Sequence, residues 1–295
     1  MQRETSRAGL WPRILLVLIS LLGLLVAYYW VHKPFDLGVA LRIGGALLDL
    51  LTAGALFAIA AAMGRRLLAR LDLTGLTQAE HIALETACGL GLIAAAAVLL
   101  GLLGLFNRAA LWLPLLITAV ALRRSLRAAL ADWRALLDAS VAEIPHFKGH
   151  VAFITLMLGL ALLTALAMPH HWDELVYHLL GPVRYLEAGR IEAQLDNFYL
   201  GFPQQTEMLY SITISLLGRD SAAAPLHFGF GVLGLLASAG VARRFAGRAA
   251  GWMTVVLLLS SLNLGALFGW PYADLPVLAY GALALIAAER WRESR

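Results

Sequence analysis

The stretch VAFITLMLGLALLTALAM, residues 151–168, contains no charged side chain and is followed by Pro169. A helix of this length and composition can cross the ~30 Å hydrocarbon core of a bilayer, so the stretch predicts a transmembrane helix. The polar sequence PHHWDE then occupies residues 169–174 and places Asp173 next to Glu174. Ionisable residues next to membrane helices often belong to functional sites, so this pair of carboxylates is the first candidate for chemistry.

Comparable apolar runs recur along the whole chain. Hydrophobic residues make up 60% and charged residues 14% of the sequence, whereas soluble domains carry about 25% charged residues. We therefore expect an all-α polytopic transmembrane protein with an extracytoplasmic loop that carries amphipathic juxtamembrane helices. The expected spans are residues 14–31, 43–63, 82–106, 109–122, 151–168, 221–242, 249–268 and 273–288. The first is interpreted as an uncleaved helix, because no small-x-small cleavage site follows it.

The basic residues gather at the ends of these runs, mainly within residues 3–13, 65–70, 123–134 and 243–248. Arg and Lys concentrate in cytoplasmic loops, so the clusters predict a cytoplasmic N-terminus and put Asp173 outside the cytoplasm of a bacterial inner membrane. Their position at helix ends explains the pI of about 9.5 and argues against a nucleic-acid partner. The expected partner is the lipid bilayer.

Residues 202–218 decide the orientation of everything after them. If this stretch crossed the membrane, the later arginine clusters would all lie outside the cytoplasm. We therefore expect a re-entrant or interfacial helix here, which also brings Asp274 to the outer face with Asp173. The predicted organisation is an N-terminal four-helix part (1–122), a cytoplasmic connector (123–150) and a second transmembrane module (151–295) with an outer loop at 169–220.

Helical periodicity over residues 173–188 predicts one amphipathic helix on the membrane surface, which Pro182 should kink or restart after Gly181. Its polar arc would hold Asp173, Glu174, Tyr177, His178 and Arg184. One carboxylate of the Asp173–Glu174 pair could act as a general base while the other orients the nucleophile or a cation. The alternative is structural, because Asp and Glu are favoured at helix N-termini for capping and dipole reasons.

Other polar residues of the outer face are further candidates. Arg184 and Arg190 could bind a phosphate, or could pair with Glu187, Glu192 or lipid headgroups. Glu207 lies in an apolar run, where a carboxylate needs a cavity or a partner, and Asp274 begins the last span.

The histidines leave the cofactor open. His170, His171 and His178 lie near the two carboxylates and could bind a divalent metal. Their spacing matches no metal motif, however, and we assign no metal ligand and no certain cofactor.

Residues 151–288 resemble the membrane glycosyltransferases of the GT-C fold, in the group of protein mannosyltransferases, lipid A aminoarabinose transferases and RgtA/B/C/D-like lipopolysaccharide glycosyltransferases. The resemblance rests on short motifs along about half of the chain. The matching residues are WDELVYH (172–178), RRFAG (243–247), PYAD (271–274), Pro182, Tyr185, Gly189, Arg190, Pro203 and Glu207.

The resemblance implies an inverting enzyme that uses a polyprenyl-phosphate sugar as donor, with a glycan, lipid or protein hydroxyl as acceptor. Asp173 would correspond to the base that deprotonates the acceptor, and Glu174 to its neighbour in the motif. Tyr177, His178, Arg184, Arg190, Glu207 and Asp274 are the expected substrate-binding residues.

Two features depart from the family pattern. Four helices precede the usual first helix, and the helices expected after residue 288 are missing, so we expect the module to be incomplete. The alternative functions are a transporter or flippase subunit with Glu207 and Asp274 as coupling acids, or a scaffold without chemistry. Glycines at 89, 91, 101, 104, 229, 231 and 234 are expected where helices pack closely.

Overall fold

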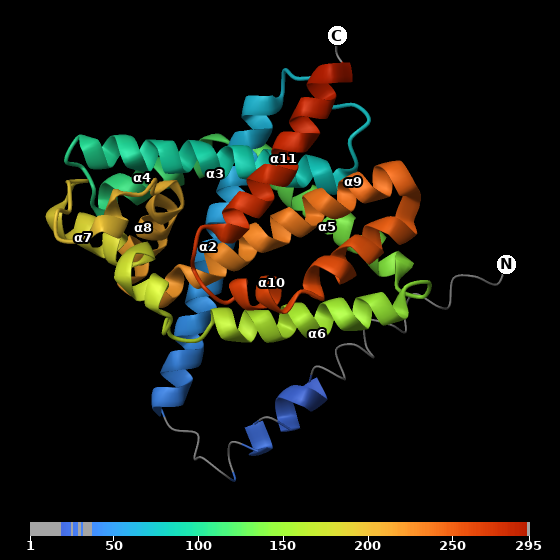
Figure 1. Ribbon diagram of the computed structural model, residues 1–295, viewed down its shortest axis with the longest axis horizontal. Coiled ribbons are helices and arrows are strands. Elements are labelled where there is room, and N and C mark those ends of the chain that lie inside the picture. Colours follow the sequence, from blue (N-terminus) through green and yellow to red (C-terminus); the bar gives the residue numbers. More distant parts are fainter. Residues whose placement is uncertain (1–18, 25, 29–30, 32–36, 294–295) are drawn as a thin grey trace. The chain divides into compact units, whose positions relative to one another are not determined.

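The computed structural model describes residues 19–24, 26–28, 31 and 37–293. The chain divides into two compact units, Met1–Leu47 and Leu48–Arg295, which are described separately. In the first unit, residues 19–24 and 26–28 are helical, and helix α2 (Leu37–Leu68) begins. The predicted span at 14–31 lies largely outside the described residues. All further statements concern the second unit, which contains the remainder of α2 and every later element (Figure 1).

Every regular element among the described residues is a helix, as the composition predicted. After α2 come α3 (Gln78–Leu102), α4 (Arg108–Ala121), α5 (Arg123–Glu143), α6 (Lys148–Ala165), α7 (Leu180–Ala188), α8 (Gln205–Leu217), α9 (Ala224–Leu259), α10 (Leu262–Leu267) and α11 (Asp274–Glu293). Short turns η1 (Glu174–His178), η2 (Phe198–Gly201) and η3 (Asp220–Ala222) lie between them. Four helical stretches are long and apolar enough to cross a membrane: Leu37–Leu68, Gln78–Leu102, Lys148–Ala165 and Asp220–Leu259.

The predicted span at 109–122 corresponds to α4, which does not continue straight into the connector. α4 and α5 meet at an angle of 82°. The sequence explains the change of direction, because α4 is apolar whereas α5 carries arginines at 123, 124, 127 and 134 among its leucines and alanines. An amphipathic helix of this kind is typical of a position along a membrane surface.

Helix α9 is broken at Gly247, whose φ of 84° and ψ of −179° are accessible only to glycine. A Cβ placed on Gly251 would lie 3.1 Å from the carbonyl oxygen of Ala239. Twelve residues of continuous helix would separate these positions by about 18 Å, so the second half of α9 folds back on the first. This matches the separation of the apolar runs 221–242 and 249–268.

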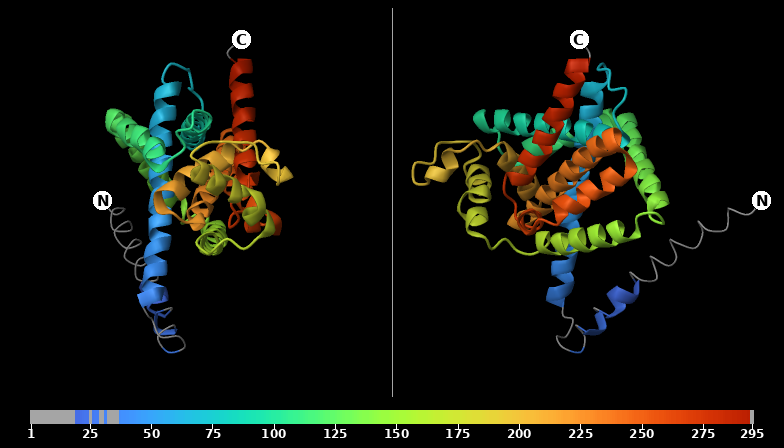
Figure 2. Two further views of the ribbon diagram at one scale, coloured as in Figure 1. Left: turned by 90° about the vertical axis from the view of Figure 1, so that its left-hand side faces the viewer. Right: turned by 45° about the vertical axis from the view of Figure 1, so that its right-hand side comes forward.

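The core of the second unit forms around the first half of α9. Helices α3, α6 and α11 all pack against α9, and α10 lies between α9 and α6 (Figures 1 and 2). Fully buried side chains such as Phe230, Leu233 and Leu275 fill this interface. Dispersion contacts between these side chains stabilise the interface, and they do so even where the surrounding solvent is lipid and not water.

Glycines allow α2 and α3 to approach each other closely. A Cβ on Gly89 would lie 1.8 Å from the carbonyl oxygen of Ala60, and a Cβ on Gly64 would lie 1.7 Å from that of Glu85. Gly229, Gly231 and Gly234 also face side chains of other helices at less than 3.4 Å, as predicted. Gly101 faces Ile191 and Phe106 of two loops, and Gly91 has its nearest neighbour, the hydroxyl of Tyr280, at 3.6 Å. Gly104 faces open space and has a φ of 73° at the end of α3.

Gly89→Ala is expected to lower the free energy of unfolding by about 1–3 kcal/mol, because the added methyl group forces two helix backbones apart. The measurement is the apparent Tm of the purified protein in detergent. Gly159→Ala is the matched control, since a Cβ at Gly159 in α6 meets nothing within 4 Å. Equal Tm values for the two variants would contradict this account of the α2–α3 contact.

The outer loop differs from the single surface helix predicted over 173–188. It contains the π turn η1 and then α7, which begins at Leu180 with Pro182 in its first turn. The predicted polar face points to water only in part: Glu174 and His178 are buried, whereas Asp173, Tyr177 and Arg184 are partly exposed. The physical reason is tertiary, because α7 packs on α8, and α8 supplies polar partners that a helical wheel does not contain.

Helix α8 covers most of residues 202–218, the stretch that was predicted not to cross the membrane. It has 13 residues, and a helix of that length extends only about 20 Å, less than the ~30 Å of a hydrocarbon core. Its residues from Glu207 to Ile214 are all buried in the second unit. Its length is therefore compatible with a segment that enters the protein without crossing a bilayer.

Candidate functional site

The Asp173–Glu174 pair lies where α6 has ended and η1 begins, and its two carboxylates have different surroundings. The Glu174 carboxylate is buried and accepts hydrogen bonds from the backbone N–H groups of His170, at 2.7 Å, and His171, at 2.9 Å. It therefore fixes the loop that follows α6. Asp173 is partly exposed and its carboxylate makes no hydrogen bond to another described residue, so the carboxylate is available to a ligand.

The π turn η1 brings Tyr177 and His178 next to this pair. Leu179 donates its N–H to the carbonyl oxygen of Glu174 at 2.9 Å, which is the wider hydrogen bond of a π turn. Single π turns inside helices are frequent at functional sites, because the extra residue changes the direction of the side chains. Here it directs His178 inward, where 5% of the residue is exposed.

His178 forms a buried pair with Glu207 from the first turn of α8. The Nδ1 atom of His178 lies 2.6 Å from Oε1 of Glu207. The second carboxylate oxygen, Oε2 of Glu207, is buried without a hydrogen-bond partner among the described residues. A carboxylate on Nδ1 fixes the ring orientation and leaves Nε2 to interact with another group. The structure thus supplies the partner that the sequence required for a carboxylate in an apolar run.

A second buried junction connects α8 to the loop before α11. The hydroxyl of Tyr210 donates to the carbonyl oxygen of Tyr272 at 2.5 Å and lies 2.8 Å from Nδ1 of His227. Because the single hydroxyl proton is used on the carbonyl, His227 must donate its Nδ1–H to Tyr210. This junction holds the loop that carries Asp274.

Asp274 and Asp173 act on the same two tyrosines. Burial and then the charge of Asp173 raise the pKa of Tyr272 to about 12, with Asp274 among the further causes. Burial, Asp173 and Asp274 also raise the pKa of Tyr177. Two aspartates that are distant in the sequence therefore both lie within electrostatic range of these tyrosines.

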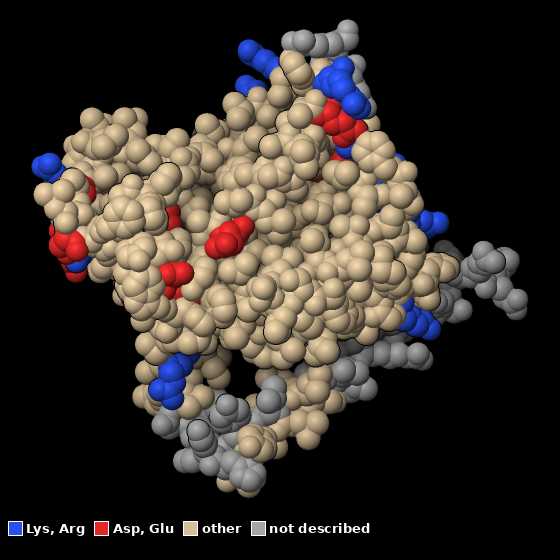
Figure 3. Space-filling model, viewed as in Figure 1, with Lys and Arg blue, Asp and Glu red and all other residues tan. Residues whose placement is uncertain are grey.

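Aromatic rings connect these segments. The ring centroids of His171 and Trp270 are 3.8 Å apart, those of His178 and Tyr272 are 5.2 Å apart, and those of Tyr177 and Tyr199 are 5.3 Å apart. The aromatic–acidic cluster is defined here as the side chains of Asp173, Glu174, Glu207, Asp274, Tyr177, His178, Tyr199, Trp270 and Tyr272. Figure 3 shows acidic atoms near the middle of this face of the molecule without basic atoms among them.

The two arginines that were predicted to bind a phosphate both have acidic neighbours in the structure. Arg184 binds Asp196 and Gln194, each at 2.9 Å, and so anchors the loop after α7. Arg190 is exposed, 3.8 Å from Glu192. Among the described residues, neither guanidinium pairs with an acid of the aromatic–acidic cluster. The predicted alternative to phosphate binding was an ion pair with Glu187 or Glu192. Arg184 does form an ion pair, but its partner is Asp196.

Within the part of the chain that the structure describes, no group of three or more His, Cys, Asp or Glu side chains is placed to hold a metal ion. His170 and His171 instead contact each other, with ring centroids 4.4 Å apart.

Sequence reasoning missed Tyr272, Trp270 and His227 as members or supports of the site. The signal for His227 was present, because a histidine in a long apolar helix needs a buried partner. Tyr272 and Trp270 lie in the turn WPYAD, in which only Asp274 was predicted as a site residue.

Tyr210→Phe is expected to lower the free energy of unfolding by about 1–3 kcal/mol, because it leaves buried hydrogen-bonding groups of His227 and Tyr272 without their partner. Thermal unfolding in detergent measures the loss. Tyr280→Phe is the comparison, since it removes one hydroxyl that donates to the carbonyl oxygen of Ala87 at 2.9 Å from a partly exposed ring. An equal or larger loss for Tyr280→Phe would argue against the junction.

Comparisons with known proteins found no family model, no curated protein and no solved structure that matches the chain.

Proposed function

We propose that this chain is a membrane glycosyltransferase of the GT-C kind, which transfers a sugar from a polyprenyl-phosphate donor to an acceptor hydroxyl on the extracytoplasmic side of the membrane. The observation that supports this most is the convergence of Asp173, Glu207 and Asp274 from three separate segments on one group of aromatic rings. Acids that meet in this way next to long apolar helices favour a site for a polar ligand with a lipid tail.

In the proposed reaction, Asp173 accepts the proton of the acceptor hydroxyl. The acceptor oxygen forms a bond to the anomeric carbon, and the bond from that carbon to the phosphate oxygen breaks. The phosphate leaves with the bonding electrons as polyprenyl phosphate, so one displacement inverts the anomeric centre. Asp173 suits the role of base because its carboxylate is partly exposed and makes no hydrogen bond to another described residue.

The other members of the cluster would position the two substrates. His178, held through Nδ1 by Glu207, offers Nε2 to a phosphate oxygen or to a sugar hydroxyl. Tyr177 and Tyr272 keep their protons at neutral pH, since their pKa values are raised, and each can donate a hydrogen bond. Glu174 keeps the loop in place through the backbone of His170 and His171.

The test is a transfer assay with the purified full chain in liposomes. Radiolabelled polyprenyl-phosphate sugars are supplied with a membrane extract as the source of acceptors, and the label is followed from the donor into product. Transfer that depends on the chain supports the proposal. Uptake or flipping of the labelled lipid without transfer would support the transporter alternative and refute the enzyme.

The side of the membrane is tested separately. The chain has a single cysteine, so Cys88→Ala provides a background in which Asp173→Cys is the only thiol. A membrane-impermeant maleimide added to intact cells is expected to label this position. Labelling that occurs only after the cells are opened would overturn the extracytoplasmic assignment.

A further inference from the structure

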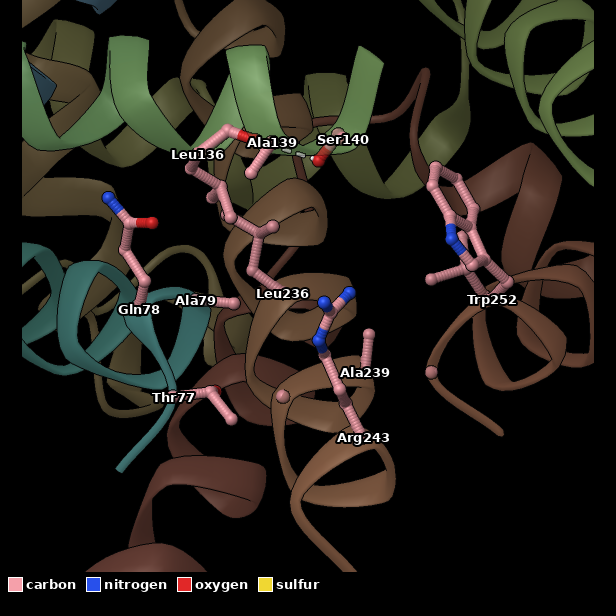
Figure 4. Close-up of a pocket in the computed structure, with 13 residues that line it drawn as sticks. Thr77, Gln78, Ala79, Leu136, Ala139, Ser140, Leu236, Ala239, Arg243 and Trp252 are labelled. Atoms are coloured by element: carbon pink, nitrogen blue, oxygen red, sulfur yellow. Dashed lines mark hydrogen bonds between the residues drawn. The ribbon is translucent and has the colours of Figure 1, made fainter. Parts of the chain in front are cut away.

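A cavity lies apart from the aromatic–acidic cluster, between the start of α3, the second half of α5 and both halves of α9. Its volume is about 330 Å³, near the lower end of the ~300–1,000 Å³ range of ligand pockets. Figure 4 shows Leu136 and Ala139 entering it from α5, and Leu236 and Ala239 from α9. None of its lining residues takes part in the proposed transfer.

The polar side chains in the wall of this pocket are already satisfied by the protein. Gln78 donates to the backbone of Asp132 at 2.9 Å, and Ser140 donates to that of Leu136 at 2.9 Å. Thr77 donates to Glu80 at 2.8 Å. An occupant therefore meets mainly apolar surface, and a polar group placed among these side chains would lose its hydrogen bonds to water. The pocket favours a hydrocarbon chain.

Positively charged side chains outnumber negatively charged ones among Arg243, Glu143 and Arg248 at the edge of this pocket. Arg243 binds Glu143 through both terminal nitrogens, at 2.7 and 3.0 Å, and the indole N–H of Trp252 donates to the same carboxylate at 2.8 Å. Arg248 is also close enough to Glu143 to stabilise its charge. The Arg248 guanidinium adds a second positive charge within electrostatic range of this carboxylate, and the side chain of Arg243, which lines the pocket, is 43% exposed. This excess suits a ligand with one negative charge.

From these two properties we infer that the pocket binds an anionic phospholipid of the bilayer, with an acyl chain between α5 and α9 and the phosphate at Arg243 and Arg248. Basic pockets between membrane helices recognise anionic headgroups in this way. The bound chain would fill the space that separates α5 from the α9 hairpin. The lipid would therefore hold the amphipathic helix α5 against the core.

The test uses the purified full chain in detergent and a phosphatidylglycerol that carries a diazirine in one acyl chain. After irradiation, peptide mass spectrometry is expected to find the label on pocket residues, among them Leu236 and Trp252. Unlabelled phosphatidylglycerol should compete for the site, and phosphatidylcholine should compete more weakly. Labels confined to other surfaces, equal competition by both lipids, or stronger competition by polyprenyl phosphate would overturn the assignment.

Two variants refine the test. Ala139→Phe fills the pocket and is expected to lower labelling of its walls about tenfold or more, whereas Ala135→Phe, one turn earlier on the same helix and outside the pocket, should not. Arg248→Gln is expected to reduce the preference for phosphatidylglycerol over phosphatidylcholine about fivefold. An unchanged preference would show that the headgroup is not bound here. The map of labels on the unaltered chain decides the question even if a variant does not fold.

Discussion

Asp173→Asn is expected to lower the rate of sugar transfer by about 10²–10⁴-fold, which is the usual contribution of a general base. Asparagine has nearly the same shape as aspartate but cannot accept the proton of the acceptor hydroxyl. The carboxylate of Asp173 makes no hydrogen bond to another described residue, so the substitution should leave the fold intact. The measurement is initial transfer from a labelled polyprenyl-phosphate sugar in liposomes, with the Tm as a check on folding.

A variant of the neighbouring acid, Glu174, distinguishes a catalytic role from a structural role within the same motif. Glu174→Gln keeps an oxygen that can accept the backbone N–H groups of His170 and His171, so it should retain much more activity than Asp173→Asn. Glu187→Gln on the exposed side of α7 serves as the control and should transfer at the normal rate. If Asp173→Asn transferred sugar as well as this control, Asp173 would not be the base.

The helices were predictable from the sequence because a helix that crosses a membrane needs a continuous run of apolar residues, and such runs are visible in the local composition. Apolar runs of sufficient length predicted α2, α3, α6 and the first half of α9 to within a few residues. The span predicted at 249–268 is instead divided into the second half of α9, which ends at Leu259, and the separate helix α10. Capping explains part of the difference in boundaries: α3 begins after Thr77, whose side chain and that of Glu80 form a reciprocal N-terminal capping box. The first predicted span lies largely outside the described residues.

The site was predictable only in part, because its partners come from distant segments. Asp173, Glu174, Glu207 and Asp274 stood out as carboxylates next to apolar runs. No local pattern indicates that Glu207 meets His178, or that Tyr210 meets His227 and the backbone of Tyr272. The helical wheel also failed at residues 174–178, because it assumed a constant turn angle where the chain forms a π turn.

Arg244→Met is expected to destabilise the protein by about 3–5 kcal/mol, the usual cost of removing one partner from a buried charge group. The guanidinium of Arg244 binds Glu80 at 2.9 Å and Glu289 at 2.6 Å. Glu80 is fully buried and begins α3, whereas Glu289 lies near the end of α11. Methionine keeps much of the volume but leaves the buried Glu80 carboxylate without its ion-pair partner and removes the arginine bound to Glu289, so α3, α9 and α11 would lose their common ionic contact.

The loss is measured as the shift in apparent Tm and as the rate of proteolysis in detergent. Arg134→Met is the matched control, because Arg134 and its partner Asp138 are 4.0 Å apart and both largely exposed, and such pairs contribute little. Adding Glu80→Gln to Arg244→Met should recover part of the stability, since it removes the charge that the first substitution left unpaired. A double variant less stable than Arg244→Met alone would mean that Glu80 stabilises the fold by capping α3 and not by its pairing with Arg244.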